Sequence, residues 1–351
     1  MISPSSRIYV AGHRGMVGSA IVRGLLGRGY SNIIKKSHDQ LDLTSQAAVR
    51  SFFKKEKIDY VVLAAAKVGG IHANDTYPAD FITTNLQIEC NVIQEAYSAG
   101  IKDILFLGSS CIYPKECPQP IKEKYLLTGK LEPTNAPYAV AKIAGITMCE
   151  AFNRQYGTRY IAVMPTNLYG PDDNFHLENS HVIPAMIRKY HLAQMAVIQD
   201  VQAIIDDEQI FGTIPEQIRK DIGLSAEGSF IPGIEPRVVL WGTGDAYREF
   251  LHVDDMAAAC IHLMTIDSPC PPLINIGSGK DQTIRETAEL VRKTINFSGQ
   301  TIFNSAFPDG TPRKCLDTTK INELGWKPRI GLVKGLERTY AWYLEQSRKK
   351  N

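Results

Sequence analysis

Short apolar runs alternate with helical patterns along the first part of the chain. Apolar positions recur at helical spacing in Val17–Leu26, Gln46–Glu56, Asp80–Ala99 and Ala136–Tyr156. The runs between them do not alternate strictly between apolar and polar residues, and they are Arg7–Ala11, Asn32–Lys35, Tyr60–Ala65, Asp103–Gly108 and Tyr160–Met164. Strands buried on both faces and separated by helices predict an α/β fold, a doubly wound parallel sheet of the Rossmann type.

The pattern loosens after Pro165, and this change predicts a second, smaller region. Two further helices are expected there, over Arg285–Thr294 and Val333–Glu345. We expect an NADP-binding domain over residues 1–170, to which a segment around 240–265 could return, and an α/β substrate domain over 171–351.

Residues 194–237 carry no chemical motif, and we interpret them as an insertion in the substrate domain. The insertion could shape the substrate mouth, change a dimer surface or decorate the exterior. Decoration is the simplest expectation, because inserted loops cost little stability.

Composition and charge exclude several classes of protein. The 39 basic and 37 acidic residues give a net charge of +2, which does not indicate a nucleic-acid partner. No apolar stretch reaches the roughly 20 residues that span a bilayer, and the first residues do not resemble a signal peptide. The seven cysteines are scattered and form no CxxC pair, which favours a reducing, cytoplasmic location over a disulfide framework or a metal site.

A glycine-rich segment joins the first predicted strand to the first helix. It reads Gly12-His13-Arg14-Gly15-Met16-Val17-Gly18, with the spacing GxxGxxG. Such a loop gives a tight turn, a close backbone approach to a pyrophosphate and a helix N-terminus that faces negative charge. The alternative is a simple glycine turn before a helix. Its position at the first strand favours a dinucleotide cofactor.

The end of the second predicted strand bears on the choice between NAD and NADP. An NAD site requires an acidic residue about 20 residues after the glycine loop. Here the segment contains Lys35, Lys36 and His38, and the first acid is Asp39. Cations suit a 2′-phosphate and favour NADP(H), although a solvated basic strand end is the alternative. Asp42 and Leu43 are expected near the adenine.

Three residues have the types and spacing of a carbonyl reductase. Tyr138 and Lys142 lie four residues apart and share a helix face, where the ammonium would lower the pKa of the phenol. The tyrosine could then give a proton to a carbonyl that receives hydride. Ser109 lies at the end of the fourth strand, where open α/β sheets bind ligands. A lone YxxxK fits an ordinary amphipathic helix, but the serine and the glycine loop favour the catalytic interpretation.

Two more residues could form an acid/base pair. Cys111 follows Ser109 by two positions, so in an extended segment both side chains would share one side. A thiol can act as a base there, although a structural cysteine is the alternative. His181 can act as an acid or base near neutral pH, and its alternative is a capping or core histidine before a helix.

Together these motifs resemble the extended short-chain dehydrogenase/reductase family. Within it, the chain is similar to the 3,5-epimerase/4-reductase branch that converts GDP-4-keto-6-deoxy-D-mannose to GDP-L-fucose. The matching segments span most of the chain outside residues 194–237, and they are Gly12–Ser19, Leu63–Gly70, Gly108–Lys115, Tyr138–Gly145, Met164–Gly170, Arg248–Asp255 and Pro308–Lys314.

The resemblance implies a role for each matched residue. Ser109, Tyr138 and Lys142 would form the reductase triad, and Cys111 and His181 the base and acid of epimerisation. Lys189, Trp241, Arg248 and Asp309 would hold the GDP-sugar. The residues expected at the NADP(H) are Gly12, His13, Arg14, Gly15, Met16, Val17, Gly18, Lys36, His38, Asp42, Leu43, Ala64, Ala65, Ala66, Leu107, Gly108, Ser109, Ser110, Lys142, Pro165, Thr166, Asn167, Leu168 and His181.

The resemblance also implies a homodimer, built through a contact of Asp80–Ala99 and Ala136–Tyr156. Two alternatives remain at this point. A related nucleotide-sugar 4-epimerase or reductase would keep NAD(P) bound without needing Cys111 and His181. A catalytically silent nucleotide-binding regulator would have no use for an activated tyrosine.

Overall fold

The computed structural model describes residues 2–226, 228–307 and 309–348, and these form two compact units. Unit one comprises the chain up to Leu168, Glu249–Lys280 and Cys315–Arg329. Unit two comprises Tyr169–Arg248, Asp281–Lys314 and the chain from Ile330 onwards.

Unit one is built on a six-stranded parallel sheet in the order β2-β1-β3-β4-β5-β9. The expected doubly wound α/β architecture is confirmed. The strands are β1 (Ile8–Ala11), β2 (Ile33–Ile34), β3 (Tyr60–Leu63), β4 (Asp103–Leu107), β5 (Arg159–Pro165) and β9 (Leu273–Ile276). The sequence interpretation missed β9, because four residues, three of them apolar, do not distinguish a strand from a piece of buried helix.

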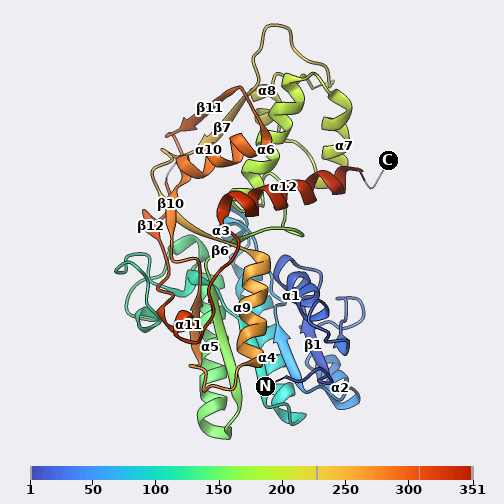
Figure 1. The fold of residues 1–351 in the computed structure, drawn as a ribbon, viewed down its shortest axis with the longest axis vertical. Helices are drawn as coiled ribbons and strands as arrows, with labels where there is room; N and C mark the ends of the chain where they lie inside the picture. Colours follow the sequence, from blue (N-terminus) through green and yellow to red (C-terminus); the bar gives the residue numbers. More distant parts are fainter. Residues whose placement is uncertain (1, 227, 308, 349–351) are drawn as a thin grey trace. The chain divides into compact units, whose positions relative to one another are not determined.

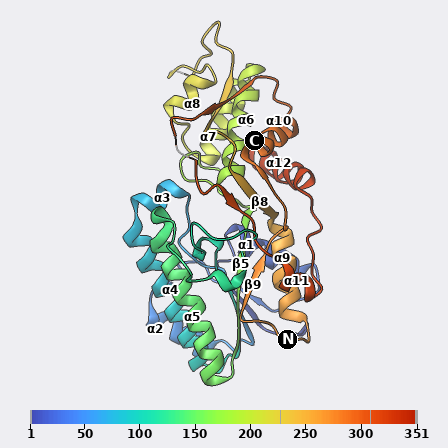
Figure 2. The same cartoon turned by 90° about the vertical axis from the view of Figure 1, so that its left-hand side faces the viewer.

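Helices cover both faces of this sheet (Figures 1 and 2), and each face has its own apolar cluster. The helices of the first cluster are α1 (Met16–Leu26) and α9 (Val253–Thr265); those of the second are α2 (Gln46–Lys55), α4 (Pro78–Ser98) and α5 (Ala136–Tyr156). Leu105 and Leu107 of β4 belong to the first cluster, whereas Ile104 and Phe106 belong to the second. Successive side chains of a strand point to opposite faces, so both clusters are continuous with the same strand.

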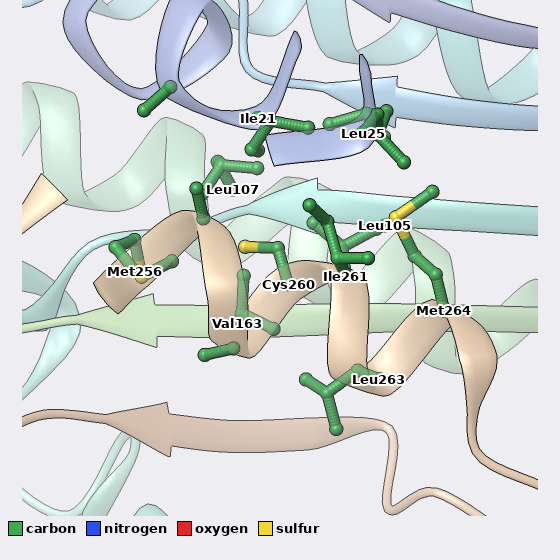
Figure 3. Packing of buried hydrophobic residues seen from close by; sticks show 14 of the residues in the cluster. Ile21, Leu25, Leu105, Leu107, Val163, Met256, Cys260, Ile261, Leu263 and Met264 are labelled. Atoms are coloured by element: carbon green, nitrogen blue, oxygen red, sulfur yellow. The ribbon is translucent and has the colours of Figure 1, made fainter. Parts of the chain in front are cut away.

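Figure 3 shows the first cluster at close range. Met256, Cys260 and Ile261 of α9 lie over the strands that carry Leu105 and Val163. These side chains are almost completely excluded from solvent, which makes burial of apolar surface the main source of stability for this layer.

The strand order reverses between β1 and β3, because β2 pairs with one side of β1 and β3 with the other. In open α/β sheets this reversal leaves a crevice at the carboxyl ends of the two strands, where ligands bind. Two segments begin at this crevice, namely the glycine loop that follows β1 and Ala64–Ala66, which follow β3.

Unit two contains four longer helices, one short helix and strands of two small sheets. The longer helices are α6 (Val182–Val197), α7 (Val201–Phe211), α10 (Ile284–Ile295) and α12 (Leu332–Arg348), and the short one is α8 (Glu216–Asp221). One sheet pairs β7 (Arg237–Trp241) with β11 (Gln300–Asn304). The other has the order β10 (Asp281–Thr283), β8 (Tyr247–His252), β12 (Arg313–Lys314), and the part of β8 from Glu249 onwards belongs to unit one. The helices α10 and α12 occur within a few residues of the predicted ranges.

The remaining elements are short. They are α3 (Ile71–Thr76), β6 (Asn167–Tyr169), α11 (Thr319–Glu323) and the 3₁₀ helices η1 (Ser110–Ile112), η2 (Glu123–Tyr125) and η3 (Pro133–Asn135).

The interpreted insertion contributes to the interior of unit two. Arg188 of α6 is fully buried, and its Nε donates to Asp207 Oδ1 of α7 at 2.8 Å. Its Nη1 donates to the carbonyl of Phe211 at 2.8 Å, and the Tyr343 hydroxyl donates to Asp207 Oδ2. The expectation of an external decoration is therefore wrong for α7, since a buried arginine requires this helix to supply its counter-charge.

Replacing Asp207 tests how far unit two depends on this pair. The variant Asp207→Ala leaves the Arg188 guanidinium buried without its carboxylate and should lower the free energy of unfolding by about 3–5 kcal/mol. Urea denaturation measures this change. The matched control is the neighbouring Asp206→Ala, expected to change stability by less than about 0.5 kcal/mol; equal losses in both variants would contradict the assignment.

Candidate active site

The glycine loop lies where the backbones of β1 and β3 come closest. Gly12 has φ of +80°, and a Cβ there would lie 2.7 Å from the Ala65 nitrogen. A Cβ on Gly18 would lie 2.1 Å from the Gly12 carbonyl oxygen. Gly15 is the N-cap of α1 and has no side chain to cap the first N–H groups. The loop therefore leaves the first N–H groups of α1 without a side-chain cap, next to Ala64 and Ala65, in the arrangement that suits an anion.

Cationic side chains surround this loop. Desolvation of the ring, followed by the charges of Arg14 and Lys35, lowers the pKa of His13. Lys36 is half-buried, and His38 is exposed with its Nδ1 3.9 Å from Asp42 Oδ1. Lys35 was not among the expected cofactor residues, although it stood in the same basic segment.

Asp42 and Leu43 are held by local hydrogen bonds. Asp42 Oδ1 accepts from the Thr44 backbone nitrogen at 2.9 Å and from the Thr44 hydroxyl at 2.7 Å. The carbonyl of Leu43 accepts from Asn91 Nδ2 at 2.9 Å, while the Leu43 side chain belongs to the second apolar cluster. Leu43 can thus offer only its backbone to a ligand.

The segment after β3 is fixed by Asn85 of α4, which is fully buried. Its Oδ1 accepts from the Lys67 backbone nitrogen at 2.9 Å, and its Nδ2 donates to the Lys67 carbonyl at 3.0 Å. These bonds pin the chain just beyond Ala64, Ala65 and Ala66. Sequence analysis missed Asn85, although an amide on the apolar face of a helix signals a buried polar partner.

The ends of β4 and β5 meet beside this segment. The Gly108 nitrogen donates to the Val163 carbonyl at 2.9 Å, directly after Leu107. Thr166 and Asn167 follow Pro165 and both donate side-chain hydrogen bonds to the carbonyl of Glu249, at 3.2 and 2.9 Å. Leu168 packs against the first apolar cluster.

The segment after Ser109 does not stay extended, so the condition under which strand alternation would place Ser109 and Cys111 on one side is not met. Ser109 is the N-cap of η1, and its Oγ accepts from the Cys111 backbone nitrogen at 3.2 Å. This capping bond starts a 3₁₀ turn, because the serine side chain satisfies an N–H that an extended strand would leave to a neighbour. Ser110 is buried within the turn. Ser109 and Cys111 remain close together, but through the turn and not through strand alternation.

The catalytic candidates of unit one lie around Tyr138. Its hydroxyl forms a hydrogen bond with the Ser109 side chain, and Cys111 lies near enough to act on it electrostatically. The ring packs edge-on against Phe81, with centroids 6.3 Å apart. The structure thus brings Ser109, Cys111 and Tyr138 together.

The expected lowering of the tyrosine pKa does not occur in the structure. Burial raises the pKa of Tyr138, and the charges of Cys111 and Glu89 add to this, whereas the Ser109 hydrogen bond opposes it. The Lys142 ammonium is 5.9 Å from the Tyr138 ring centroid and is already paired with Glu89, its Nζ lying 3.1 Å from Oε1. A neutral pair contributes little of the field that a single cation would exert.

Glu89 is the main residue that sequence analysis missed. It lies on α4 with Ile88 and Val92, is 1% exposed, and burial raises its pKa. A carboxylate on an otherwise apolar helix face was the available signal, since charged residues are almost never fully buried unless paired.

His181 lies in unit two, at the N-cap of α6, without a side-chain capping bond. Desolvation of the ring and, to a smaller extent, the Lys314 charge lower the pKa of His181. The imidazole therefore favours its neutral form, in which one nitrogen can accept a proton.

Three of the four expected substrate residues lie close together in unit two. Trp241 is 64% exposed and stacks on Phe307, with centroids 4.4 Å apart and the rings 10° from parallel. Asp309 accepts from the Thr243 nitrogen and hydroxyl at 3.0 and 2.8 Å. Desolvation lowers the pKa of Arg248, and the Asp309 carboxylate opposes this effect.

Lys189 is placed differently. Its Nζ donates to the Val239 carbonyl of β7 at 3.0 Å, and desolvation lowers the pKa of the ammonium. It therefore lies under the strand that carries Trp241.

The described residues contain no group of His, Cys, Asp and Glu side chains suited to hold a metal ion. Within the same ranges, no helix is long and apolar enough to cross a membrane. The cysteines there form no disulfide.

Comparison with known proteins defines the class. The model of the NAD dependent epimerase/dehydratase family matches residues 8–209 and 222–277. The chain belongs to this family, in agreement with the resemblance that its motifs showed. The match is interrupted at residues 210–221, which lie within the interpreted insertion.

Individual relatives are more specific. The chain is 52% identical over 345 residues to GDP-L-fucose synthase 1 of Arabidopsis thaliana, covering 98% of this chain and 95% of the relative. It is 49% identical over 347 residues to GDP-L-fucose synthase of Escherichia coli K12, covering 97% of each. A solved GDP-mannoheptose C4 reductase from Campylobacter jejuni, with NADP bound, is 38% identical with a TM-score of 0.83 over 98% of this chain and 100% of that one.

The crowding at Gly18 gives a test of the loop. In Gly18→Ala, the added Cβ forces the Gly12 backbone to move, and we expect NADPH to bind at least about tenfold more weakly, a change of about 1.4 kcal/mol. Titration of protein fluorescence with NADPH measures this affinity. Gly27→Ala is the control, because a Cβ there lies 3.4 Å from its nearest neighbour, at the other end of α1. Unchanged affinity in Gly18→Ala would mean that the loop does not contact the cofactor.

Proposed function

We propose that this chain converts GDP-4-keto-6-deoxy-D-mannose to GDP-L-fucose, through epimerisation at C3 and C5 and reduction of the C4 ketone with NADPH. The observation that carries the proposal is the hydrogen-bonded Ser109 and Tyr138 with Cys111 beside them, at the carboxyl end of β4. The relatives named GDP-L-fucose synthase, at about half identity over nearly the full chain, support the same reaction.

The residues after β1 and β2 fit NADP(H). Gly12 and Gly18 allow the tight loop at the N-terminus of α1 that a pyrophosphate needs, because a Cβ at either position would collide with neighbouring backbone atoms. Arg14, Lys35 and Lys36 supply positive charge for a 2′-phosphate. The other residues proposed to contact the cofactor are those expected from the sequence after β3, β4 and β5, together with Lys142 and His181.

Reduction at C4 requires a proton at the carbonyl oxygen as hydride reaches the carbon. Bound NADPH supplies the hydride. Tyr138 donates the proton to O4, and Ser109 orients both the Tyr138 hydroxyl and the carbonyl by hydrogen bonds. The raised pKa of Tyr138 keeps the phenol protonated at neutral pH, which suits a proton donor.

Epimerisation uses the same polarised carbonyl. The C4 ketone acidifies the protons on C3 and C5, and the hydrogen bonds from Ser109 and Tyr138 stabilise the enolate that forms when one is removed. Cys111 and His181 serve as the base and the acid, so that a proton leaves one face and another returns to the opposite face. The lowered pKa of His181 fits an imidazole that exchanges protons near neutral pH.

The GDP portion binds to the group in unit two. Arg248 presents a planar guanidinium suited to bidentate contact with a phosphate. The exposed Trp241 ring offers a stacking surface, and Lys189 and Asp309 supply further charge.

The second candidate is a C4 reductase without epimerase activity. The Campylobacter jejuni structure, a GDP-mannoheptose C4 reductase, favours it. Such an enzyme needs Tyr138 and Ser109 but no base at Cys111. The two candidates therefore differ in whether C3 and C5 exchange protons with solvent.

We further propose a cytoplasmic homodimer. The helices α4 and α5 contact each other, and hydrophobic side chains such as Val140 and Tyr156 of α5 remain exposed. Exposed apolar side chains of this kind fit a helical dimer interface. The absence of disulfides among the described cysteines fits a reducing compartment. A monomer in analytical ultracentrifugation would exclude the dimer.

Removing the Tyr138 hydroxyl tests the proton donor. Tyr138→Phe should lower kcat for reduction by about 10²–10⁴-fold, because the developing alkoxide loses its proton source. The loss of NADPH absorbance with GDP-4-keto-6-deoxy-D-mannose measures the rate, and NMR identifies the product. NADPH affinity should stay at the wild-type value. Undiminished turnover would reject Tyr138 as the donor.

Cys111→Ser separates epimerisation from reduction. Since a serine hydroxyl is a much weaker base, deuterium uptake from solvent at C3 or C5 should fall by about 10²-fold, the smaller end of acid–base effects. Mass spectrometry of the product in deuterium oxide measures the uptake. Cys117→Ser is the control and should exchange at the wild-type rate. Wild-type exchange in Cys111→Ser would favour the reductase without epimerase activity.

A further inference from the structure

A buried ion pair links α4 to the helix that carries Tyr138. Lys142 and Glu89 are 2% and 1% exposed, and their charged atoms lie 3.1 Å apart. The Lys142 ammonium also lies over the Phe106 ring, 4.7 Å from its centroid. Figures 1 and 2 show α4 and α5 side by side along the sheet. The lysine is thus held between Glu89 of α4 and Phe106 of β4.

The Glu89 carboxylate is packed closely against Gly145 and the Phe106 ring. A Cβ on Gly145, one turn after Lys142 on α5, would lie 2.7 Å from Glu89 Oε2 and 2.5 Å from Phe106 Cζ. Glu89 Oε2 is buried and has no hydrogen-bond partner in the described ranges. A carboxylate with an unsatisfied oxygen is costly in a buried site, and the Lys142 ammonium is the charge that compensates it.

Several titratable groups lie around the tyrosine and the pair. Cys111 from η1, Glu89 from α4 and Lys142 from α5 face Tyr138. The Lys67–Asp80 pair contacts Phe81, the ring that packs edge-on against Tyr138.

Two thiols also lie within the field of Glu89. Cys90 on α4 and Cys149 on α5 both have a raised pKa, burial being the larger cause and the Glu89 charge the next. Glu89 is therefore the one carboxylate in the described surroundings that acts on both Lys142 and Tyr138.

We propose that Glu89 is a positioning residue that fixes the Lys142 ammonium beside Tyr138 and holds a negative charge close to this proton donor. This inference rests on the proposed role of Tyr138 in reduction. Glu89 touches neither the substrate nor the cofactor and acts through Lys142 and through its charge.

The sign of the effect follows from the charges. Burial is the largest cause of the raised pKa of Tyr138, and the Cys111 and Glu89 charges raise it further. In Glu89→Gln the shape is kept and the negative charge is lost, so Tyr138 should lose its proton at lower pH. Reduction needs this proton, and activity is lost as pH rises.

The experiment is a pH profile of kcat/KM for reduction in the full-length protein. In Glu89→Gln the high-pH limb should move to lower pH by about one unit, the smaller end of the effect of a nearby charge. Glu89→Asp keeps the negative charge, but its side chain is one methylene shorter, so the carboxylate lies farther from Lys142. Its high-pH limb should stay at the wild-type pH, while the KM for NADPH rises because Lys142 is displaced.

Glu95→Gln is the matched control. Glu95 is also buried on α4, and its Oε1 pairs with Arg50 at 2.8 Å, away from Tyr138. This variant removes the charge of another buried α4 carboxylate, whose partner Arg50 is half exposed, so it should lower stability without moving the limb. If Glu89→Gln also lowers stability and leaves the limb in place, the role is structural and the inference is overturned.

Tyr138→Phe, measured in parallel, separates this inference from the proposed function. If it abolishes reduction while Glu89→Gln keeps the wild-type profile, the proposed function stands and the role of Glu89 falls. If it retains turnover, the role of Tyr138 falls and this inference with it. If Glu89→Gln does not fold, the Glu89→Asp variant decides, and a wild-type KM for NADPH in that variant overturns the positioning role.

Discussion

A parallel sheet covered by helices on both faces leaves polar chemistry only at the ends of its strands. In unit one the side chains of β4 alternate between two apolar clusters, so no polar group can act from the middle of the strand. Gly12, Ala65, Gly108 and Thr166 all follow strand ends, and each backbone is close to a neighbouring strand or loop. The site lies at the strand ends because the middle of the sheet is buried on both faces.

The electrostatics of the site depend on how buried charges are compensated. Lys142 lies in the interior, and a buried ammonium without a counter-charge would lose its proton or destabilise the fold. Glu89 supplies the counter-charge and thereby cancels much of the field on Tyr138. Burial and this cancelled field keep Tyr138 protonated. A protonated tyrosine suits reduction of a ketone better than a phenolate would.

The same principle operates in unit two with a structural result. Arg188 is as deeply buried as Lys142, and Asp207 compensates it from α7. The segment that interrupts the family match, residues 210–221, thus begins at the end of α7, the helix that carries Asp207, and contains α8. Of the nearby residues, Lys189 of α6 donates to the carbonyl of Val239, whereas the Trp241 ring of β7 stays exposed.

The sequence alone determined the doubly wound fold, the glycine loop and the residues Ser109, Cys111 and Tyr138, because periodicity and local motifs report on neighbours along the chain. Tertiary structure decided the strand β9, the 3₁₀ turn after Ser109, the internal position of α7 and the partner of Lys142. Each of these depends on a contact between residues far apart in sequence: Glu89 meets Lys142, and Arg188 meets Asp207. Spacing along a chain cannot specify which buried charge will face which, since that is set by how the helices pack.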